Sequence, residues 1–193
     1  TREAILFVEA AGFDIVIVET VGVGQSETDV ANLTDVFVLM QLPNAGDDLQ
    51  AIKRGIVELA DVFVYNKRDL DPAAADRAMA QMAGALYLLR PAAATWKPPV
   101  LGVSALTGEG VPEFWRDVLR CRDTLAASSE LAAKRRRQAL AWTWHLIDHG
   151  LRERFHADRA VRDALPLVLE QVGAGTLTPT AAAARLLEQT RGR

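Results

Sequence analysis

Short, nearly continuous apolar runs alternate with helical stretches over residues 1–104. The runs are rich in β-branched and aromatic residues, are bounded by turn residues, and cover residues 14–18, 35–42, 61–65 and 99–103. Continuous apolar strands are those that a parallel sheet buries on both faces. The intervening and following stretches read as helices over residues 27–33, 47–59, 72–89 and 109–125. This alternation predicts an α/β fold with a doubly wound, mostly parallel sheet.

The pattern changes near residue 128, where strand signals stop and Ala, Leu and Arg dominate. Two apolar stripes at helical spacing predict two helices, formed by Leu140, Trp144, Ile147, Leu151 and Phe155, and then by Val161, Leu165, Val168 and Val172. Thr178 followed by Pro179 predicts the start of a third helix, with the hydroxyl as N-cap. We expect an α/β region over residues 1–127 and a helical appendage over residues 128–193. The appendage either packs against a partner or forms a self-sufficient bundle.

Charge and composition exclude several classes of protein. The net charge is −3, whereas nucleic-acid binders usually carry a basic excess. Residues 1–129 hold 11 Lys and Arg against 18 Asp and Glu, and residues 130–193 hold 11 against 7, which suggests two regions with different roles. The four consecutive bases at 134–137 read as a solvated helix face, with an acidic partner as the alternative. Cys121 is the single cysteine, which fits a reducing cytoplasm, and no apolar run approaches the length of a membrane span.

The first apolar run ends in an acid that a glycine follows three residues later. In doubly wound sheets, ligands bind beyond the carboxyl ends of the strands. Glu19 could hold or orient Mg²⁺ at that position, and the amide of Gly22 could approach a γ-phosphate because no Cβ blocks it. The alternative is an ordinary glycine-rich turn between a strand and a helix.

The ends of the third and fourth runs carry a more specific pattern. The sequence Asn-Lys-Arg-Asp at residues 66–69 is the guanine-recognition tetrad of GTPases, in which Asp69 accepts two hydrogen bonds that adenine cannot offer. Asn66 would tie neighbouring loops together, and the stem of Lys67 would lie over the base. The fourth run continues into Ser104, Ala105 and Leu106, where GTPases place a turn whose backbone amide reads the guanine O6. The three signals in this order predict GTP or GDP as the ligand; the alternative for the tetrad is a charged turn.

Longer segments resemble one family. FDIVIVETVGVGQSE, LPNAGDDLQAIKRGIVELAD and NKRD, together with QALAWTWHLIDHGL and GTLTPTAAAARLL in the tail, resemble the methylmalonyl-CoA mutase-associated (MeaB-like) GTPases. These proteins act as chaperones of cobalamin-dependent acyl-CoA mutases, and older descriptions of the family name an arginine/ornithine (LAO/AO) transport-system kinase. The resemblance covers essentially the whole chain.

The resemblance implies roles for individual residues. The catalytic candidates are Glu19, which would sit near Mg²⁺, Gly22, which would sense the γ-phosphate, and Lys53. Val21 and Gln25 would belong to the second switch, and Asp47 and Asp48, with Lys53, to an extra switch that couples the nucleotide state to the mutase. An acidic first helical turn is an equally good reading of Asp47 and Asp48. Val23 stands where many GTPases keep a water-orienting glutamine, and Gln25 cannot be assumed to replace it, so we expect slow intrinsic hydrolysis.

The phosphate-binding loop of GTPases is missing from the sequence. No G-x-x-x-x-G-K-[ST] occurs, and the family's phosphate loop and first switch would precede Thr1, where residues 2–11 read as the end of a helix already under way. We therefore expect residues 1–127 to be the carboxy-terminal part of a P-loop GTPase domain that is a poor or inactive enzyme alone. The resemblance implies that residues 128–193 mediate homodimerisation or bind the partner mutase. The alternatives are a non-hydrolysing interaction module and a transport-linked ATPase or kinase.

Overall fold

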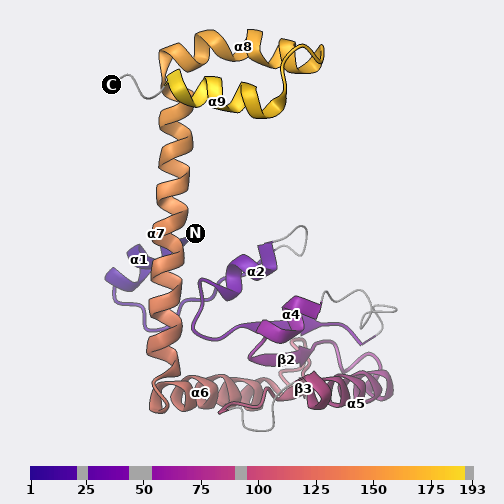
Figure 1. Ribbon diagram of the computed structural model, residues 1–193. Helices are drawn as coiled ribbons and strands as arrows, with labels where there is room; N and C mark the ends of the chain where they lie inside the picture. The colour runs from indigo at the N-terminus through magenta and orange to yellow at the C-terminus, as the bar shows by residue number, and fades with distance from the viewer. Residues whose placement is uncertain (21–25, 44–53, 90–94, 190–193) are drawn as a thin grey trace. The chain divides into compact units, whose positions relative to one another are not determined.

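The computed structural model describes residues 1–20, 26–43, 54–89 and 95–189 (Figure 1). The chain divides into two compact units, Thr1–Gln138 and Ala139–Arg193. The division thus falls eleven residues later than the expected boundary at residue 127, inside a long helix, α7 (Glu130–Ala157). None of the described helices is both long enough and apolar enough to span a membrane.

The first unit contains a parallel sheet whose strands follow chain order. Strand β1 (Val38–Gln41) pairs with β2 (Val62–Tyr65), and β2 pairs with β3 (Val100–Gly102). All four residues of β2 are buried, as the continuous apolar run over residues 61–65 predicts for a central strand. The predicted strands within residues 35–42, 61–65 and 99–103 are confirmed.

Helices cover both faces of this sheet, as predicted for a doubly wound fold. On one face, Phe63 and Tyr65 pack in a cluster that includes Met82 of α5 (Pro72–Leu89). On the other face, Val62 and Val64 pack with Phe114 of α6 (Val111–Ala127). This division follows because successive side chains of a strand point to opposite faces. The short helices α2 (Ser26–Ala31) and α4 (Arg54–Leu59) add Ala31 and Val57 to the first cluster.

The expected first strand is absent from the described residues, so the prediction for Asp14–Val18 is wrong. The segment follows α1 (Arg2–Ala10) as an extended chain without strand pairing, and the side chains of Ile15 and Ile17 are 55% and 85% exposed. A strand requires a neighbour that accepts and donates its backbone hydrogen bonds. Within the described residues, β1 pairs only with β2, so no strand supplies those bonds to residues 14–18.

The second unit is helical, and all three predicted tail helices are present. The carboxyl-terminal part of α7 is followed by α8 (Arg159–Gly173) and α9 (Pro179–Gln189). The Oγ1 of Thr178 accepts a hydrogen bond from the Ala181 amide at 3.3 Å, which confirms the predicted N-cap of α9. Helices α8 and α9 share a core around Val168, Ala182 and Leu186.

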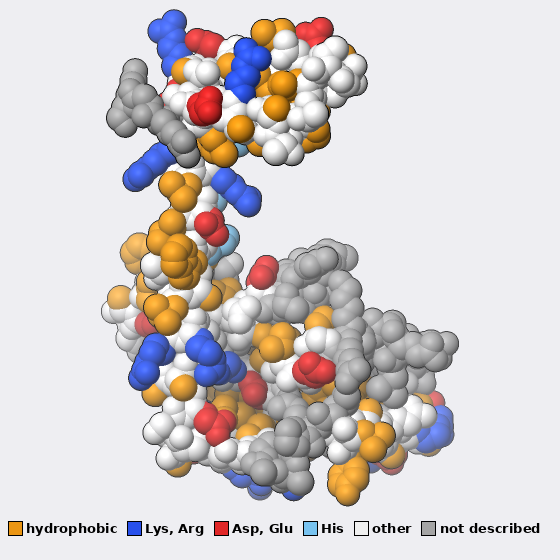
Figure 2. Space-filling model, in the orientation of Figure 1, with side chains coloured by type: hydrophobic (Ala, Val, Ile, Leu, Met, Phe, Trp, Pro, Cys, Tyr) orange, Lys and Arg blue, Asp and Glu red, His pale blue; other side chains and the backbone are white. Residues whose placement is uncertain are grey.

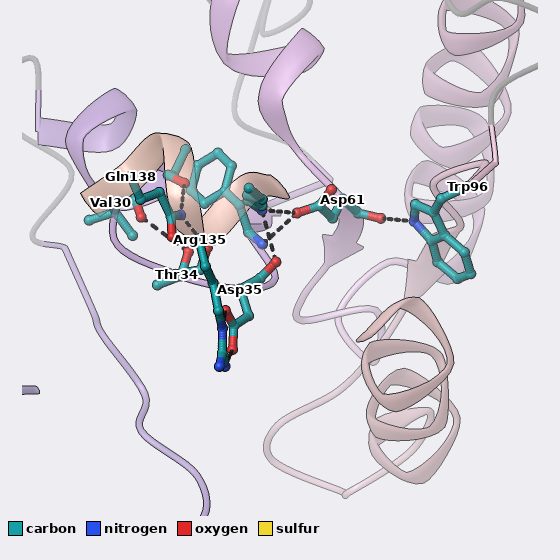
Figure 3. A network of polar contacts seen from close by, with 10 residues as sticks. Val30, Thr34, Asp35, Asp61, Trp96, Arg135 and Gln138 are labelled. Atoms are coloured by element: carbon teal, nitrogen blue, oxygen red, sulfur yellow. Dashed lines mark hydrogen bonds and ion pairs between the residues drawn. The ribbon is translucent and has the colours of Figure 1, made fainter. Parts of the chain in front are cut away.

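The first turns of α7 bind the first unit through polar contacts (Figure 3). Lys134 forms an ion pair with Asp61, and Arg135 forms one with Asp35. The Nε2 of Gln138, a buried residue, donates to the carbonyl oxygen of Thr34 at 3.0 Å. These contacts explain why the first unit extends to Gln138. Within the basic run, Lys134 is largely buried by its pair with Asp61. Arg135, Arg136 and Arg137 are exposed, so the predicted solvated face holds for these three and not for Lys134.

Candidate functional site

Two loops follow neighbouring strands at the carboxyl edge of the sheet. Residues 66–70 follow β2, and residues 104–110 follow β3. Because β2 and β3 are paired and parallel, both loops leave the sheet at the same edge. The structure therefore brings together the two segments in which the sequence placed the base-binding residues, at the edge where doubly wound folds bind ligands.

Asn66 joins these loops by its side chain. Its Oδ1 accepts hydrogen bonds from the amide of Lys67 at 2.7 Å and from the amide of Ala105 at 3.1 Å. Its own amide donates to the carbonyl of Gln41 at 2.9 Å, so the end of β1 is also connected. The predicted tying of neighbouring loops by Asn66 is present. The Ala105 amide is already engaged, and an incoming acceptor would share or replace the Asn66 oxygen.

The loop after β2 is held in a tight turn. Lys67 adopts a positive φ of 61°, an uncommon conformation for a residue with a side chain. Its carbonyl accepts a hydrogen bond from Leu70 at 3.1 Å, and the Arg68 amide donates to Val103 at 3.0 Å. The Lys67 side chain remains exposed, whereas Asp69 is partly buried. The backbone of this loop is thus fixed to β3 before any ligand is present.

The loop after β3 is closed around Ser104, which is fully buried. The Ser104 Oγ accepts from the amide of Thr107 at 3.1 Å, and its backbone amide donates to the Glu109 carbonyl at 2.9 Å. Gly110 is required at the loop's end, because its φ is +76° and a Cβ there would lie 2.4 Å from the Gly102 carbonyl oxygen. Leu106, at the tip, is 86% exposed. Ser104 is therefore the support of the loop, and its hydroxyl is directed at the protein's own backbone.

The candidates for phosphate and metal chemistry are only partly described. Glu19 is exposed in the extended segment after residues 14–18. The predicted switch and catalytic residues Val21, Gly22, Gln25, Asp47, Asp48 and Lys53 lie outside the described residues. Among the described residues, no group of three His, Cys, Asp or Glu side chains could hold a metal ion. Of the residues predicted for phosphate and metal chemistry, only Glu19 lies in the part of the chain that the structure describes.

Arg68, the remaining residue of the tetrad, is not among the residues predicted for the site. Its guanidinium lies 2.7 Å from the Oε1 of Glu109 and 3.2 Å from the Oδ1 of Asp76. The tetrad pattern specifies its first, second and fourth residues and allows any residue at the third. The pattern therefore predicts no role for Arg68. Asp76 and Glu109 are 8 and 41 residues away from Arg68 in the sequence, and only the fold brings them into contact with it.

Comparisons with known proteins agree with this architecture. A family model described as methylmalonyl Co-A mutase-associated GTPase MeaB matches residues 1–160. A mouse protein named methylmalonic aciduria type A homolog, mitochondrial, is 44% identical over an alignment of 194 residues that covers 100% of this chain and 47% of the mouse protein. GTPase ArgK of Escherichia coli is 46% identical over 144 residues, 73% of this chain and 43% of that protein.

A solved structure shares the fold. The crystal structure of an LAO/AO transport system kinase superposes with a TM-score of 0.75 at 36% sequence identity, covering 97% of this chain and 60% of that one. The fold is therefore that of a P-loop GTPase. The chain spans about half the length of the two curated relatives.

Proposed function

Because this chain belongs to the MeaB family of methylmalonyl-CoA mutase-associated GTPases, we propose that its two strand-end loops form the base-binding half of a guanine-nucleotide site. The observation that carries this proposal is the hydrogen bond from the Ala105 amide to Asn66 Oδ1, at 3.1 Å. It links the tetrad to the turn after β3, and base recognition needs both loops in fixed positions.

Each residue has a distinct part in the proposed recognition of guanine. The carboxylate of Asp69 accepts hydrogen bonds from the N1–H and the exocyclic amine, a pair of donors that adenine lacks. The stem of Lys67 covers one face of the ring, and its exposure leaves it free to do so. Leu106 presents its backbone amide to the O6, and the Ala105 amide does so by sharing or replacing its bond to Asn66 Oδ1. Ser104 holds their turn in place. Selectivity for guanine over adenine follows from these donors and acceptors.

We also propose that the whole protein hydrolyses GTP. In the whole protein, Glu19 would orient Mg²⁺ and its waters, and Gly22 would sense the γ-phosphate. Most contacts to the triphosphate in P-loop proteins come from a backbone cradle and its lysine, which this sequence lacks. We therefore propose that GTP hydrolysis, with Mg²⁺, belongs to the protein that includes the upstream segment of the relatives, and that it is slow without a partner.

The partner we propose is a cobalamin-dependent acyl-CoA mutase such as methylmalonyl-CoA mutase. The name of the family associates it with that enzyme. In this proposal, the chain acts as a chaperone that loads or protects the mutase cofactor, and Asp47, Asp48 and Lys53 transmit the nucleotide state. We include a cytoplasmic location, because a single cysteine suits a reducing compartment.

We also propose different functions for the two parts of the chain. Residues 1–127 would supply the GTPase part, and residues 128–193 would form a homodimer or bind the mutase. The support is a stripe on α7, defined here as Leu140, Trp144, Ile147 and Leu151, whose side chains are 59%, 64%, 42% and 58% exposed. Figure 2 shows hydrophobic side chains gathered along this helix. Such a row on an exposed helix face is typical of an interaction surface.

A titration of this chain with GDP and ADP tests the proposed base site. In ¹⁵N-labelled protein, GDP should shift the amide signals of Lys67, Ala105 and Leu106, whereas ADP at the same concentration should leave them unchanged. A non-hydrolysing interaction module that has lost the base site would give no shifts with either nucleotide. Equal shifts with both would contradict guanine recognition.

A further inference from the structure

Arg68 connects three segments around the proposed base site. Its Nη1 lies 2.7 Å from Glu109 Oε1, in the loop after β3. Its Nε and Nη2 lie 3.3 and 3.2 Å from Asp76 Oδ1, in α5. One guanidinium therefore joins the loop after β2, in which Arg68 itself stands, to the loop after β3 and to a helix.

The aliphatic stem of Arg68 packs closely against the end of β3. An ideal Cβ on Gly102 would lie 2.7 Å from Arg68 Cδ and 3.1 Å from Met79 Sδ, so a larger residue at this position would require the Arg68 stem to shift. The side chain of Arg68 is 31% exposed. The stem thus crosses the end of β3 beside Met79 before the head group reaches its two carboxylates.

Glu109 makes two contacts, one within its own loop and one to the loop after β2. Its carbonyl closes the loop on Ser104, and its carboxylate is held by Arg68. Exposed ion pairs are individually weak, and Asp76 and Glu109 are 56% and 57% exposed. The geometry nevertheless restrains position, because the planar guanidinium fixes both carboxylates relative to one stem. Restraining Glu109 restrains the amides of Ala105 and Leu106 in the same short loop.

We infer that Arg68 is a positioning residue for base recognition, which holds the loop of residues 104–110 where its amides meet the O6 of guanine. This inference rests on the proposed guanine site. Arg68 touches no part of the base and acts through Glu109 and the loop. It therefore affects the O6 contact more than the contact that Asp69 makes to the exocyclic amine.

The test compares two nucleotides in three variants of this chain. Guanosine diphosphate carries O6 and an N1–H, whereas 2-aminopurine riboside diphosphate keeps the exocyclic amine and lacks both. Each variant is therefore compared with the parent chain for the same nucleotide. Arg68→Ala removes the stem and the charge, and Arg68→Met keeps an unbranched apolar stem. Arg116→Ala is the matched control, since Arg116 forms its ion pair with Glu113 of its own helix, away from the two loops. Affinities come from amide-shift titrations, and loop order comes from hydrogen exchange at Ala105 and Leu106.

We expect both Arg68 variants to weaken GDP binding by about fivefold and to change 2-aminopurine nucleotide binding by less than about twofold. Hydrogen exchange at the Ala105 and Leu106 amides should accelerate in both, and Arg116→Ala should match the parent chain. A uniform loss for both nucleotides, or unchanged GDP binding with unchanged exchange, overturns the inference. If the parent chain binds neither nucleotide, the proposed function fails, and the exchange rates alone decide whether Arg68 holds the loop.

Discussion

The ammonium of Lys134 in α7 lies 3.0 Å from the Oδ2 of Asp61, the residue that precedes β2. The same ammonium donates to the carbonyl of Asp35 at 2.8 Å, and the same carboxylate oxygen accepts from the Phe37 amide at 2.9 Å. The carbonyl of Asp61 accepts from the Trp96 indole at 2.8 Å. The pair therefore joins the start of α7 to the amino-terminal edge of the sheet, opposite the base-binding edge.

Replacing Lys134 by methionine should destabilise the first unit. The two side chains are 20% and 15% exposed, so Asp61 would keep a largely buried charge without its cation. We expect the free energy of unfolding to fall by about 1–3 kcal/mol, the range for a buried group that loses its hydrogen-bond partner. Urea denaturation followed by tryptophan fluorescence measures the loss. Arg136→Met, at an exposed position of the same helix, should change stability little; equal effects of the two variants would contradict this role of Lys134.

Cys121 should resist thiol reagents until the first unit unfolds. Burial, and the nearby charge of Asp61, raise the pKa of its thiol to about 12, while Lys134 lowers it to a smaller extent. Because the thiolate is the reactive form, labelling at pH 8 should be at least about a hundredfold slower in native chain than in urea. Fast native labelling would show that Cys121 is accessible.

The raised pKa of Cys121 also makes the stability of the fold depend on pH. The folded pKa lies above the unfolded value of about 8.5, so folding favours the neutral thiol. Its contribution is fully present below about pH 8.5 and is lost as the pH rises toward 12. Cys121→Ala should therefore reduce the decline of stability above pH 8.5, as measured by urea midpoints at several pH values.

Asp69→Asn should shift base preference from guanine toward xanthine. The amide replaces one acceptor by a donor, which suits the 2-oxo group of xanthine and no longer matches the exocyclic amine of guanine. Titrations with GDP and xanthosine diphosphate should show opposite changes in affinity. Asp71→Asn is a useful comparison, because Asp71 caps α5 through the Ala74 amide at 2.9 Å and contacts no proposed ligand. Unchanged guanine preference in Asp69→Asn would remove the tetrad from the proposed site.

Much of the sheet could be predicted from local pattern. The buried strand β2 follows from an apolar run, and α5 has the bounds of the helix predicted over residues 72–89. Asp14–Val18 has the same apolar pattern and forms no strand, because pairing depends on a neighbour that no local pattern encodes. The contacts of Lys134 with Asp61 and of Arg68 with Glu109 span 73 and 41 residues, so sequence spacing gave no sign of them.

Extension of the chain by the upstream segment of its relatives should strengthen GTP binding. The triphosphate carries most of the ligand's charge, and its cradle in P-loop proteins is made of backbone amides and a lysine, for which this sequence has no matching motif. We expect this chain to bind GTP at least about a hundredfold more weakly than the extended protein. Calorimetry on both decides the matter, and micromolar binding by residues 1–193 alone would show that the base-binding half suffices.

The last prediction concerns the exposed stripe on α7. Burial of one large apolar side chain contributes roughly 1.5–3 kcal/mol, so Leu140, Trp144, Ile147 and Leu151 together could hold two copies of the helix. Closed two-fold symmetry is the usual arrangement for such a contact.

Trp144→Glu places a charge in the middle of that stripe, at a side chain that is 64% exposed in the single chain. On the dimer hypothesis, the variant should halve the mass measured by light scattering at tens of micromolar and keep the circular-dichroism spectrum. His149→Glu, on a face of α7 turned away from the stripe, should leave the mass unchanged. A parent chain that is already monomeric at that concentration, or a Trp144→Glu variant that unfolds, would mean that the stripe belongs to the chain's own core or to a different partner.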